Sequence, residues 1–291
     1  MKIHLIDGTY ELFRHHFGAP PRQAPNGQEV GATLGLLKSL IALLAQPGVT
    51  HVAVAFDHVI ESFRNQLFSG YKTGAGVDQQ LIAQFSLAED AAAALGLVVW
   101  PMVAFEADDA LASATARFEH EPSVEQIIIG SPDKDLAQLV SGSRIVCWDR
   151  RREIVLDEQG VWDKFGVGPR SIPDWLALVG DAADGYPGIA GWGAKSAAAV
   201  LARYEHLEAI PDDPQGWGLS AGRAVRLAES LAQGKAAALL YRQLATLRQD
   251  VPLQENLADL EWLGARQHLK DFGHSLGDDQ IQNRISRWRP G

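Results

Sequence analysis

Nine carboxylates of this 291-residue chain fall into five short clusters, each just past an expected strand or at an expected helix start. They are Asp7, Asp57, Glu106 with Asp108 and Asp109, Asp133 with Asp135, and Asp181 with Asp184. Carboxylates gathered in a cleft repel one another and cost stability unless something neutralises them. Because hard divalent cations prefer oxygen ligands, the pattern predicts metal-dependent phosphate chemistry, most readily on nucleic acid.

The size of this acidic set favours two cations over one. Two cations about 4 Å apart can flank a scissile phosphate, one lowering the pKa of a water and the other stabilising the leaving oxygen. Each cluster alone has a structural alternative, because acids in a first helical turn cap amides and complement the helix dipole, and Asp residues form turns. Their coincidence at strand ends and tight turns is what favours a metal site.

The elements expected to position these acids alternate between strands and helices. Apolar, β-branched runs predict strands at 2–6, 51–56, 97–102, 126–129, 144–148 and 153–156. Helical patterns lie between them at about 30–46, 79–95, 107–118 and 134–140. This alternation predicts a mostly parallel, twisted sheet covered by helices on both faces, with ligands bound beyond the carboxyl ends of the strands. Four of those ends, at Asp7, Asp57, Glu106 and Asp133, place acids at one edge.

After about residue 158 the strand signal ends. Helical patterns follow at about 158–165, 169–179, 194–204, 220–233 and 235–248. We therefore expect an α/β core over residues 1–157 and an all-helical, DNA-binding part over 158–260. The role of the C-terminal segment, 261–291, stays open.

A Gly- and Pro-rich turn joins two of these helices. Its run Gly191-Trp192-Gly193-Ala194-Lys195-Ser196 is similar to the end of a phosphate-binding P-loop, but Ala194 separates the glycine from the lysine and no strand precedes it. A hairpin between helices is the better account, in which glycines let backbone amides approach a DNA phosphate and Lys195 starts the next helix. We expect Trp192 to pack within this hairpin.

Composition narrows the function classes. The chain is 46% hydrophobic and 21% charged, as in ordinary soluble proteins, with a formal net charge of -10. Without the nine clustered acids, 27 acidic residues remain against 26 Lys plus Arg, which argues against tight non-specific DNA binding but allows binding through metals and local basic residues. The single Cys147 excludes an internal disulfide. With no apolar run of signal-peptide or membrane-spanning length, we expect a cytoplasmic protein and no membrane partner.

Taken in order, these residues make the chain resemble the 5′-nuclease family, which includes bacterial flap endonucleases and the N-terminal exonuclease domain of bacterial DNA polymerase I. The resemblance runs from Ile3 to about Leu260, and without a polymerase part we expect a stand-alone member. The motifs that carry it are Leu5-Ile6-Asp7-Gly8, Arg14, Ala55-Phe56-Asp57, Phe63-Arg64, Tyr71-Lys72, Glu106-Ala107-Asp108-Asp109, Asp133-Lys134-Asp135-Leu136, Gly180-Asp181 with Asp184, Pro187-Gly188-Ile189, Gly191-Trp192-Gly193-Ala194-Lys195, Leu244-Ala245-Thr246-Leu247 and Asp250-Val251-Pro252-Leu253.

The resemblance implies a PIN-like, resolvase-like fold followed by a helix-three-turn-helix clamp on duplex DNA at residues 188–195. It implies that the nine acids hold two Mg²⁺ or Mn²⁺ ions directly or through water, that Lys72 and Arg64 steer the scissile phosphate, and that carbonyls of the clamp turn hold a monovalent cation such as K⁺. The residues it assigns to DNA contact are Arg14, Tyr71, Gly188, Gly191, Gly193 and Lys195.

One stretch departs from the family pattern. Relatives usually follow Tyr-Lys with Asn-Arg and further basic residues in a helical arch. Here the run is Tyr71-Lys72-Thr73-Gly74-Ala75-Gly76, and no Lys or Arg occurs again until Arg117. We therefore expect little grip on a free 5′ strand.

Together these features predict a structure-specific 5′-nuclease, a 5′-3′ exonuclease or flap endonuclease that acts as a monomer on DNA with a 5′ end, flap or nick, in replication or repair. The alternative is a DNA-junction binding protein with weak or lost catalysis. A third hypothesis, a single-strand RNase of the PIN type, is disfavoured because such domains generally lack the clamp. The sequence does not set the preferred substrate, the exo-to-endo balance, the protein partners or the cleavage of RNA strands, including those of RNA–DNA hybrids.

Overall fold

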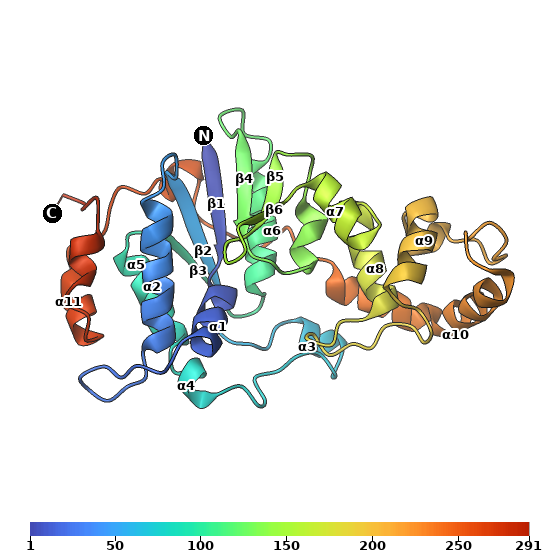
Figure 1. Cartoon of the computed structure of the whole chain (residues 1–291), viewed down its shortest axis with the longest axis horizontal. Helices are drawn as coiled ribbons and strands as arrows, with labels where there is room; N and C mark the ends of the chain where they lie inside the picture. The colour runs from blue at the N-terminus through green and yellow to red at the C-terminus, as the bar shows by residue number, and fades with distance from the viewer. Residues whose placement is uncertain (291) are drawn as a thin grey trace. The chain divides into compact units, whose positions relative to one another are not determined.

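The computed structural model describes residues 1–290, which form two compact units. Unit 1 contains Met1–Ile60, Gly74–Ser131 and the described residues from Gln249 onward. Unit 2 contains Glu61–Thr73 and Pro132–Arg248. The chain therefore enters unit 2 twice, first as a short segment and then as one long stretch (Figure 1).

Unit 1 is built on a sheet of parallel strands. In the order β3-β2-β1-β4 these are Val98–Met102, His51–Asp57, Lys2–Asp7 and Gln126–Gly130. The central strands carry apolar residues on both faces, and Ile3, Leu5 and Ile6 are fully buried. Burial of both faces is what a parallel sheet covered by helices requires. In register, Asp7 lies opposite Ala55, and Asp57 opposite Met102.

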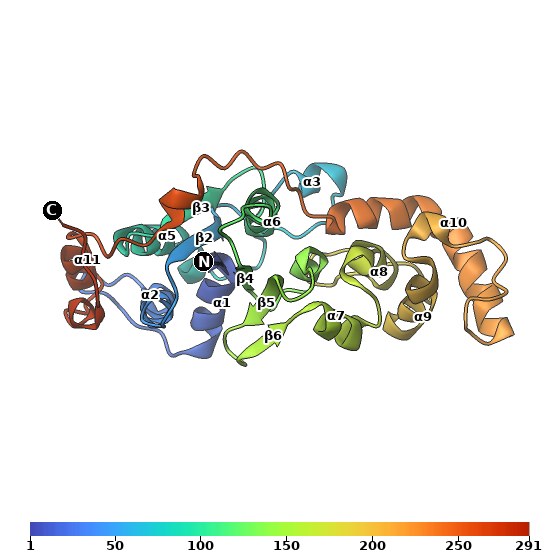
Figure 2. The same cartoon turned by 90° about the horizontal axis from the view of Figure 1, so that it is seen from above.

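The helices of unit 1 cover both faces of this sheet. They are α1 (Gly8–Gly18), α2 (Gly31–Leu44), α4 (Gln79–Ile82), α5 (Phe85–Ala94), α6 (Ala107–Phe118) and α11 (Leu269–Ser275), with short 3-10 helices at Leu257–Leu260 and Ile281–Arg284. Right-handed crossovers place α2 and α5 on one face and α6 on the other, as Figure 2 shows. The connections after β1 and after β3 thus cross opposite faces. The strand order consequently reverses beside β1, and in sheets of this type ligands bind outside the carboxyl ends of the strands at such a point.

Unit 2 is mostly helical. Its long helix α10, Ala221–Ala245, packs against α8, and α8 packs against α9. The other helices are α3 (Arg64–Leu67), α7 (Glu158–Phe165), α8 (Ile172–Val179) and α9 (Ala194–Tyr204), with 3-10 helices at Asp135–Leu139, Pro169–Ser171 and Leu207–Ala209. An antiparallel pair, β5 (Ile145–Asp149) and β6 (Ile154–Leu156), completes the unit.

The expected fold class is confirmed, a mostly parallel sheet with helices on both faces together with a helical region. All six expected strands are present, and helices 107–118 and 158–165 match α6 and α7. The two helices expected at 220–233 and 235–248 are wrong, because α10 continues through Gly234. A Cβ at Gly234 would lie 3.1 Å from the Ile189 side chain, so the glycine allows close packing rather than breaking the helix. The helix expected at 79–95 is divided into α4 and α5.

The C-terminal segment, whose role the sequence left open, packs within unit 1. The Trp262 indole Nε1 donates to the Leu95 carbonyl at 2.8 Å, and Lys38 Nζ lies 3.1 Å from Asp278. Arg289 also donates to the Gly96 carbonyl at 2.9 Å. These contacts make the segment part of the α/β unit. Among residues 1–290, no helix has the length and apolar character needed to cross a membrane.

Candidate functional site

The acid that ends β1 is held from two sides. Asp7 caps α1, because its Oδ1 accepts from the Tyr10 amide at 2.8 Å. Its Oδ2 accepts from the Ser131 hydroxyl at 2.9 Å, and Ser131 directly follows β4. Asp7 thus joins the carboxyl ends of β1 and β4, the place at which the strand order reverses.

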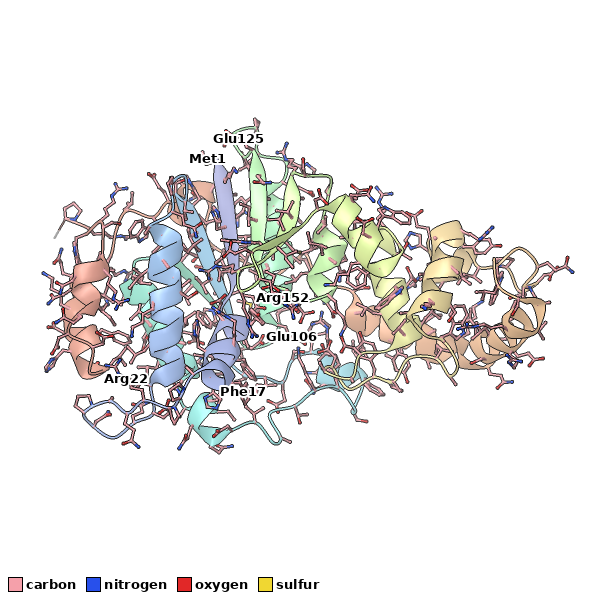
Figure 3. The ribbon with its side chains drawn as sticks, viewed as in Figure 1. Met1, Phe17, Arg22, Glu106, Glu125 and Arg152 are labelled. Carbon is pink, nitrogen blue, oxygen red and sulfur yellow. The ribbon has the colours of Figure 1, made fainter. Side chains whose placement is uncertain are left out.

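The acids after β2 and β3 meet at the start of α6. Asp57 Oδ1 accepts from the Ala107 amide at 2.7 Å, and Asp109 Oδ2 accepts from the Glu106 amide at 3.0 Å. Glu106 and Asp109 are buried, whereas Asp108 is half-buried. Figure 3 shows Glu106 at the α1 end of the unit 1 strands and Met1 with Glu125 at the opposite end. Asp7, Asp57, Glu106 and Asp109 therefore accept backbone amides at helix starts, and each carboxylate can still accept through its other lone pairs.

The acids of unit 2 come into direct proximity. Asp135, Asp181 and Asp184 are all buried, and one carboxylate oxygen of each lies within 4.8 Å of the others. We call this group the Asp triad. Asp135 Oδ1 has no hydrogen-bond partner among residues 1–290. Burial raises the pKa of Asp135 well above its ordinary value, and the negative charges of Asp133, Asp184 and Asp181 raise it further.

This geometry is suited to a divalent cation. Three buried carboxylates converge and one of their oxygens lacks a donor, which is costly in a protein interior. An oxygen-preferring cation would supply the missing positive charge at that point. The Asp triad can therefore hold a metal ion. Asp133 is exposed and does not belong to this buried group.

A tight turn presents two members of the Asp triad. Backbone hydrogen bonds join Asp181 and Tyr186 in both directions, at 2.8 and 3.0 Å. Gly180 and Gly185 both have φ of +87°, and a Cβ at Gly185 would clash with the Gly70 carbonyl oxygen. The Tyr186 ring stacks on Tyr241 with centroids 5.5 Å apart. These contacts fix the positions of both aspartates.

Two lysines partly neutralise the Asp triad. Lys72 Nζ lies 3.2 Å from Asp184 Oδ1, and the Lys72 amide donates to the Asp184 carbonyl at 2.9 Å. Lys134 Nζ lies 2.6 Å from Asp181 Oδ2. Burial opposes the charge of Lys134, but its hydrogen bond to Asp181 and the nearby carboxylates outweigh this effect and raise the pKa of Lys134. No role for Lys134 was predicted from the sequence, although its place between Asp133 and Asp135 is a signal.

Two other residues expected near the phosphate are buried. The Arg64 side chain is 1% exposed; its Nε donates to the Leu244 carbonyl at 2.7 Å and its Nη2 lies 3.3 Å from the Thr246 carbonyl oxygen. It thereby holds the C-terminal end of α10, where a cation is favoured. Tyr71 is 3% exposed and lies beneath the Lys72 ammonium, 5.6 Å from the ring centroid. Contact of these residues with DNA stays a prediction.

The turn between α8 and α9 has the expected hairpin form. Gly188 and Gly191 have φ of +72° and +80°. The Gly193 amide donates to the Ser196 hydroxyl at 3.1 Å where α9 begins, and Lys195 is exposed. The packing expected for Trp192 is confirmed, because its ring is 7% exposed and its Nε1 donates to the Leu227 carbonyl at 3.2 Å. Arg14, in unit 1, pairs with Glu11 at 2.5 Å.

One basic surface was missed from the sequence. Along α10, a row of side chains lies beside the turn and, with the backbone of Ala190 and Gly191, lines a groove of about 650 Å³. Ser230 Oγ donates to the Ala190 carbonyl at 2.6 Å, and Arg223 Nη2 lies 3.4 Å from Ser196 Oγ. The row, which we call the donor face, consists of Arg223, Arg226, Ser230 and Gln233. Their spacing of three and four residues in an expected helix was the available signal.

Comparisons with known protein families match most of the chain. Residues 2–166 match the model of the 5′-3′ exonuclease N-terminal resolvase-like domain, and residues 167–268 match that of the 5′-3′ exonuclease C-terminal SAM fold. The chain is 32% identical over 209 residues to a 5′-3′ exonuclease of Aquifex aeolicus, covering 72% of this chain and 71% of that protein.

DNA polymerase I sequences are also similar. Identity with the Pseudomonas aeruginosa enzyme is 34% over 266 residues, which cover 88% of this chain but 28% of that protein. The chain therefore spans about a third or less of the length of these polymerase relatives.

Solved structures share the fold. The D15 protein of bacteriophage T5, co-crystallised with metal ions, has a TM-score of 0.69 at 14% identity, with 98% of this chain and 97% of that chain covered. The catalytic core of Rad2 in complex with DNA substrate has a TM-score of 0.58 at 16% identity, with 97% and 90% covered.

Proposed function

Because the chain belongs to the 5′-3′ exonuclease family, we propose that it is a divalent-metal-dependent 5′ nuclease that hydrolyses phosphodiester bonds of DNA near 5′ ends or junctions. The observation that carries this proposal is the Asp triad, with its converging buried carboxylates and the Asp135 oxygen that lacks a donor. Support comes from the 5′-3′ exonuclease of Aquifex aeolicus and from the flap endonuclease of bacteriophage T5, whose complex contains DNA and metal ions.

The Asp triad, with Asp133 through water, is proposed to hold one Mg²⁺ or Mn²⁺ ion. The acids at the switch point of unit 1 are proposed to hold a second, and they are Asp7, Asp57, Glu106, Asp108 and Asp109. A zinc-bound T5 5′-exonuclease structure supports divalent metal binding in this fold. When bound, such ions activate the attacking water and stabilise the leaving oxygen.

The residues of the chain have separate tasks in this proposal. Lys72 presents an ammonium group beside Asp184, where it can stabilise charge that develops on the scissile phosphate more than it stabilises ground-state binding. Lys134 holds Asp181 in position through its 2.6 Å contact. Arg64, expected from the sequence to steer the phosphate, is better placed to fix the end of α10, because its donors are directed at the Leu244 and Thr246 carbonyls.

Duplex DNA is proposed to lie on the turn at residues 188–195 and on the donor face of α10. The exposed Gly191, Lys195 at the start of α9, and the two arginines of the donor face offer phosphate contacts, and Gly193 lets the backbone of the turn approach the duplex. Carbonyls of the turn are the proposed K⁺ site. Rad2 bound to DNA substrate and human GEN1 bound to Holliday junction DNA support DNA as the partner. We expect a monomer that acts in replication or repair.

The direct test is cleavage of 5′-labelled flap, nicked and blunt duplexes with Mg²⁺ and with EDTA. The proposal requires a metal-dependent product from at least one of them, and the product lengths give the exo-to-endo balance. Binding measured in Ca²⁺ serves as the control for folding. Binding without any product would support the alternative, a junction-binding protein without catalysis.

A further inference from the structure

A second cavity lies in unit 2, on a different side of α10. It has a volume of about 500 Å³ and is formed by α10 and by the loop that follows the 3-10 helix Leu207–Ala209. Its apolar wall includes Ile210, Trp217, Val225, Ala232 and Leu239. Both the volume and the apolar lining fall in the range of sites that bind ligands, about 300–1,000 Å³.

The cavity and the donor face are on opposite sides of one helix. Successive residues of an α-helix are turned by about 100°, so Val225, Ala232 and Leu239, seven apart, share one face. Arg223 and Arg226 of the donor face point to the other side, by the same rotation. Only Glu229 borders both hollows. The cavity is therefore distinct from the surface proposed for DNA.

The apolar wall of the cavity is partly exposed to water. Val225 and Leu239 are 46% and 37% exposed, which leaves large apolar side chains in water beside the cavity. The Trp217 side chain also lines the cavity and is 1% exposed. The wall thus offers an apolar surface to an occupant.

The border of the cavity carries net negative charge. Glu208, Asp212 and Glu229 line it, against the single cation Lys235. Glu208 is paired with Arg242, whereas Asp212 and Glu229 form no ion pair within residues 1–290. Phosphate groups are repelled from such a border, and basic side chains are attracted to it.

We propose that this cavity docks a short peptide segment of a partner protein in which bulky apolar residues are flanked by Lys or Arg. An apolar side chain of the segment fills the cavity. The basic flank lies against Asp212 and Glu229. A peptide supplies both features at once, whereas nucleic acid supplies none of the positive charge.

The test begins with selection of random peptides of about 12 residues, displayed as a library, on the full-length chain. Counter-selection uses the Leu239→Lys variant, which places a positive charge in the cavity wall and repels a basic flank. We expect enriched sequences with bulky apolar residues next to Lys or Arg, and Kd values of about 1–100 µM for the synthetic peptides, typical of short-motif recognition. No enrichment over the counter-selection, or enrichment of acidic sequences, would overturn the proposal.

Two further measurements assign the binding to this site. Glu229→Lys should weaken the peptide about tenfold or more, because it reverses an exposed charge without disturbing the core, whereas the matched reversal Asp163→Lys on α7 should change it less than about twofold. The Trp217 Nε1–H resonance, assigned with Trp217→Phe, should shift on peptide binding, because the indole ring lines the cavity. Equal affinity for parent and Glu229→Lys, or an unmoved Trp217 resonance, would refute the docking site. Neither readout depends on nuclease activity.

Discussion

The two groups of acids differ in what already satisfies them. In unit 1, Asp7, Asp57 and Asp109 each accept a backbone amide at a helix start, so the fold uses their charge as helix caps. In unit 2, the Asp triad converges in a buried position with a carboxylate oxygen that lacks a donor. Acidic motifs that look similar in the sequence can therefore differ in whether hydrogen-bond donors of the fold already stabilise their charge. Unit 1 holds its acids without a metal, whereas unit 2 holds its acids at a cost that a cation removes.

The largest expected effect is on catalysis. Replacing Asp181 and Asp184 together with Ala should lower single-turnover cleavage by about a thousandfold or more, since the loss of one cation removes several kcal/mol of transition-state stabilisation. Binding to duplex in Ca²⁺ should persist, because the turn at residues 188–195 and the donor face are unchanged. Asp163→Ala, at an exposed position of α7, is the matched control. Cleavage by the double variant at the parental rate would end the metal assignment of unit 2.

Lys72→Ala should reduce the cleavage rate by about a hundredfold and leave affinity nearly unchanged. The reason is that one cation beside Asp184 stabilises developing charge more than bound substrate. Single-turnover rates and Kd values in Ca²⁺ separate the two effects. Lys195→Ala is the informative comparison, because an exposed phosphate contact should weaken binding and its salt dependence instead. The role assigned to Lys72 fails if its replacement weakens binding as much as it slows cleavage.

Stability should depend on metal through unit 2. Burial and the acidic neighbours of Asp135 raise the pKa of its carboxyl group, so its negative charge is unfavourable without a metal. Asp135→Asn removes this charge and should therefore increase the melting temperature in EDTA at pH 7.5. Since the folded-state pKa lies above the unfolded value, the metal-free parent should lose stability as the pH rises from about 4, the ordinary range of Asp. In the parent, Mg²⁺ at about 100 times its Kd should add about 2.7 kcal/mol.

The Asp135→Asn variant should lose most of the stabilisation that Mg²⁺ gives the parent protein. Thermal unfolding with and without Mg²⁺ between pH 5 and pH 8 measures both effects. A stability change of a few tenths of a kcal/mol shifts Tm by about 1 °C. An equal Mg²⁺ response in parent and variant would show that the Asp triad is not the source of the stabilisation.

The smallest expected effect is in unit 1. Asp7→Ala should destabilise the protein by about 1 kcal/mol through loss of the α1 cap, in EDTA as well as in Mg²⁺. Asp7→Asn restores a capping side chain and should recover most of that stability without the charge. Urea unfolding of the three proteins provides the comparison. A destabilisation by Asp7→Ala that vanishes in EDTA would mean that Asp7 acts on stability through bound metal and not as a helix cap.

Local patterns predicted the elements well but not the contacts between them. Helix α6 starts at Ala107 as expected, because Glu106 and Asp109 mark a helix start in the sequence itself. The meeting of Asp135 with Asp181 and Asp184 depends on residues far along the chain, including Gly185 against Gly70 and Tyr186 on Tyr241. The sequence showed that these acids exist but gave no distance between them.

A further miss has the same origin. Gly234 suggested a helix break, yet its missing side chain is what lets α10 pack against Ile189. The contacts of Arg64 also lie outside the local pattern, because it donates to carbonyls 180 residues or more away in the sequence. Its role at the phosphate stays a prediction. Tertiary packing, which a local pattern does not contain, determines both sets of contacts.

The central claim is that the Asp triad binds a divalent cation, and Mn²⁺ binding to the DNA-free protein tests it most directly. Isothermal titration calorimetry of the parent and of the Asp181→Asn, Asp184→Asn double variant, with melting curves in EDTA to verify folding, isolates the site from catalysis. The account predicts that the double variant loses one Mn²⁺ equivalent or binds it at least about tenfold more weakly. Unchanged stoichiometry and affinity in the double variant would contradict it.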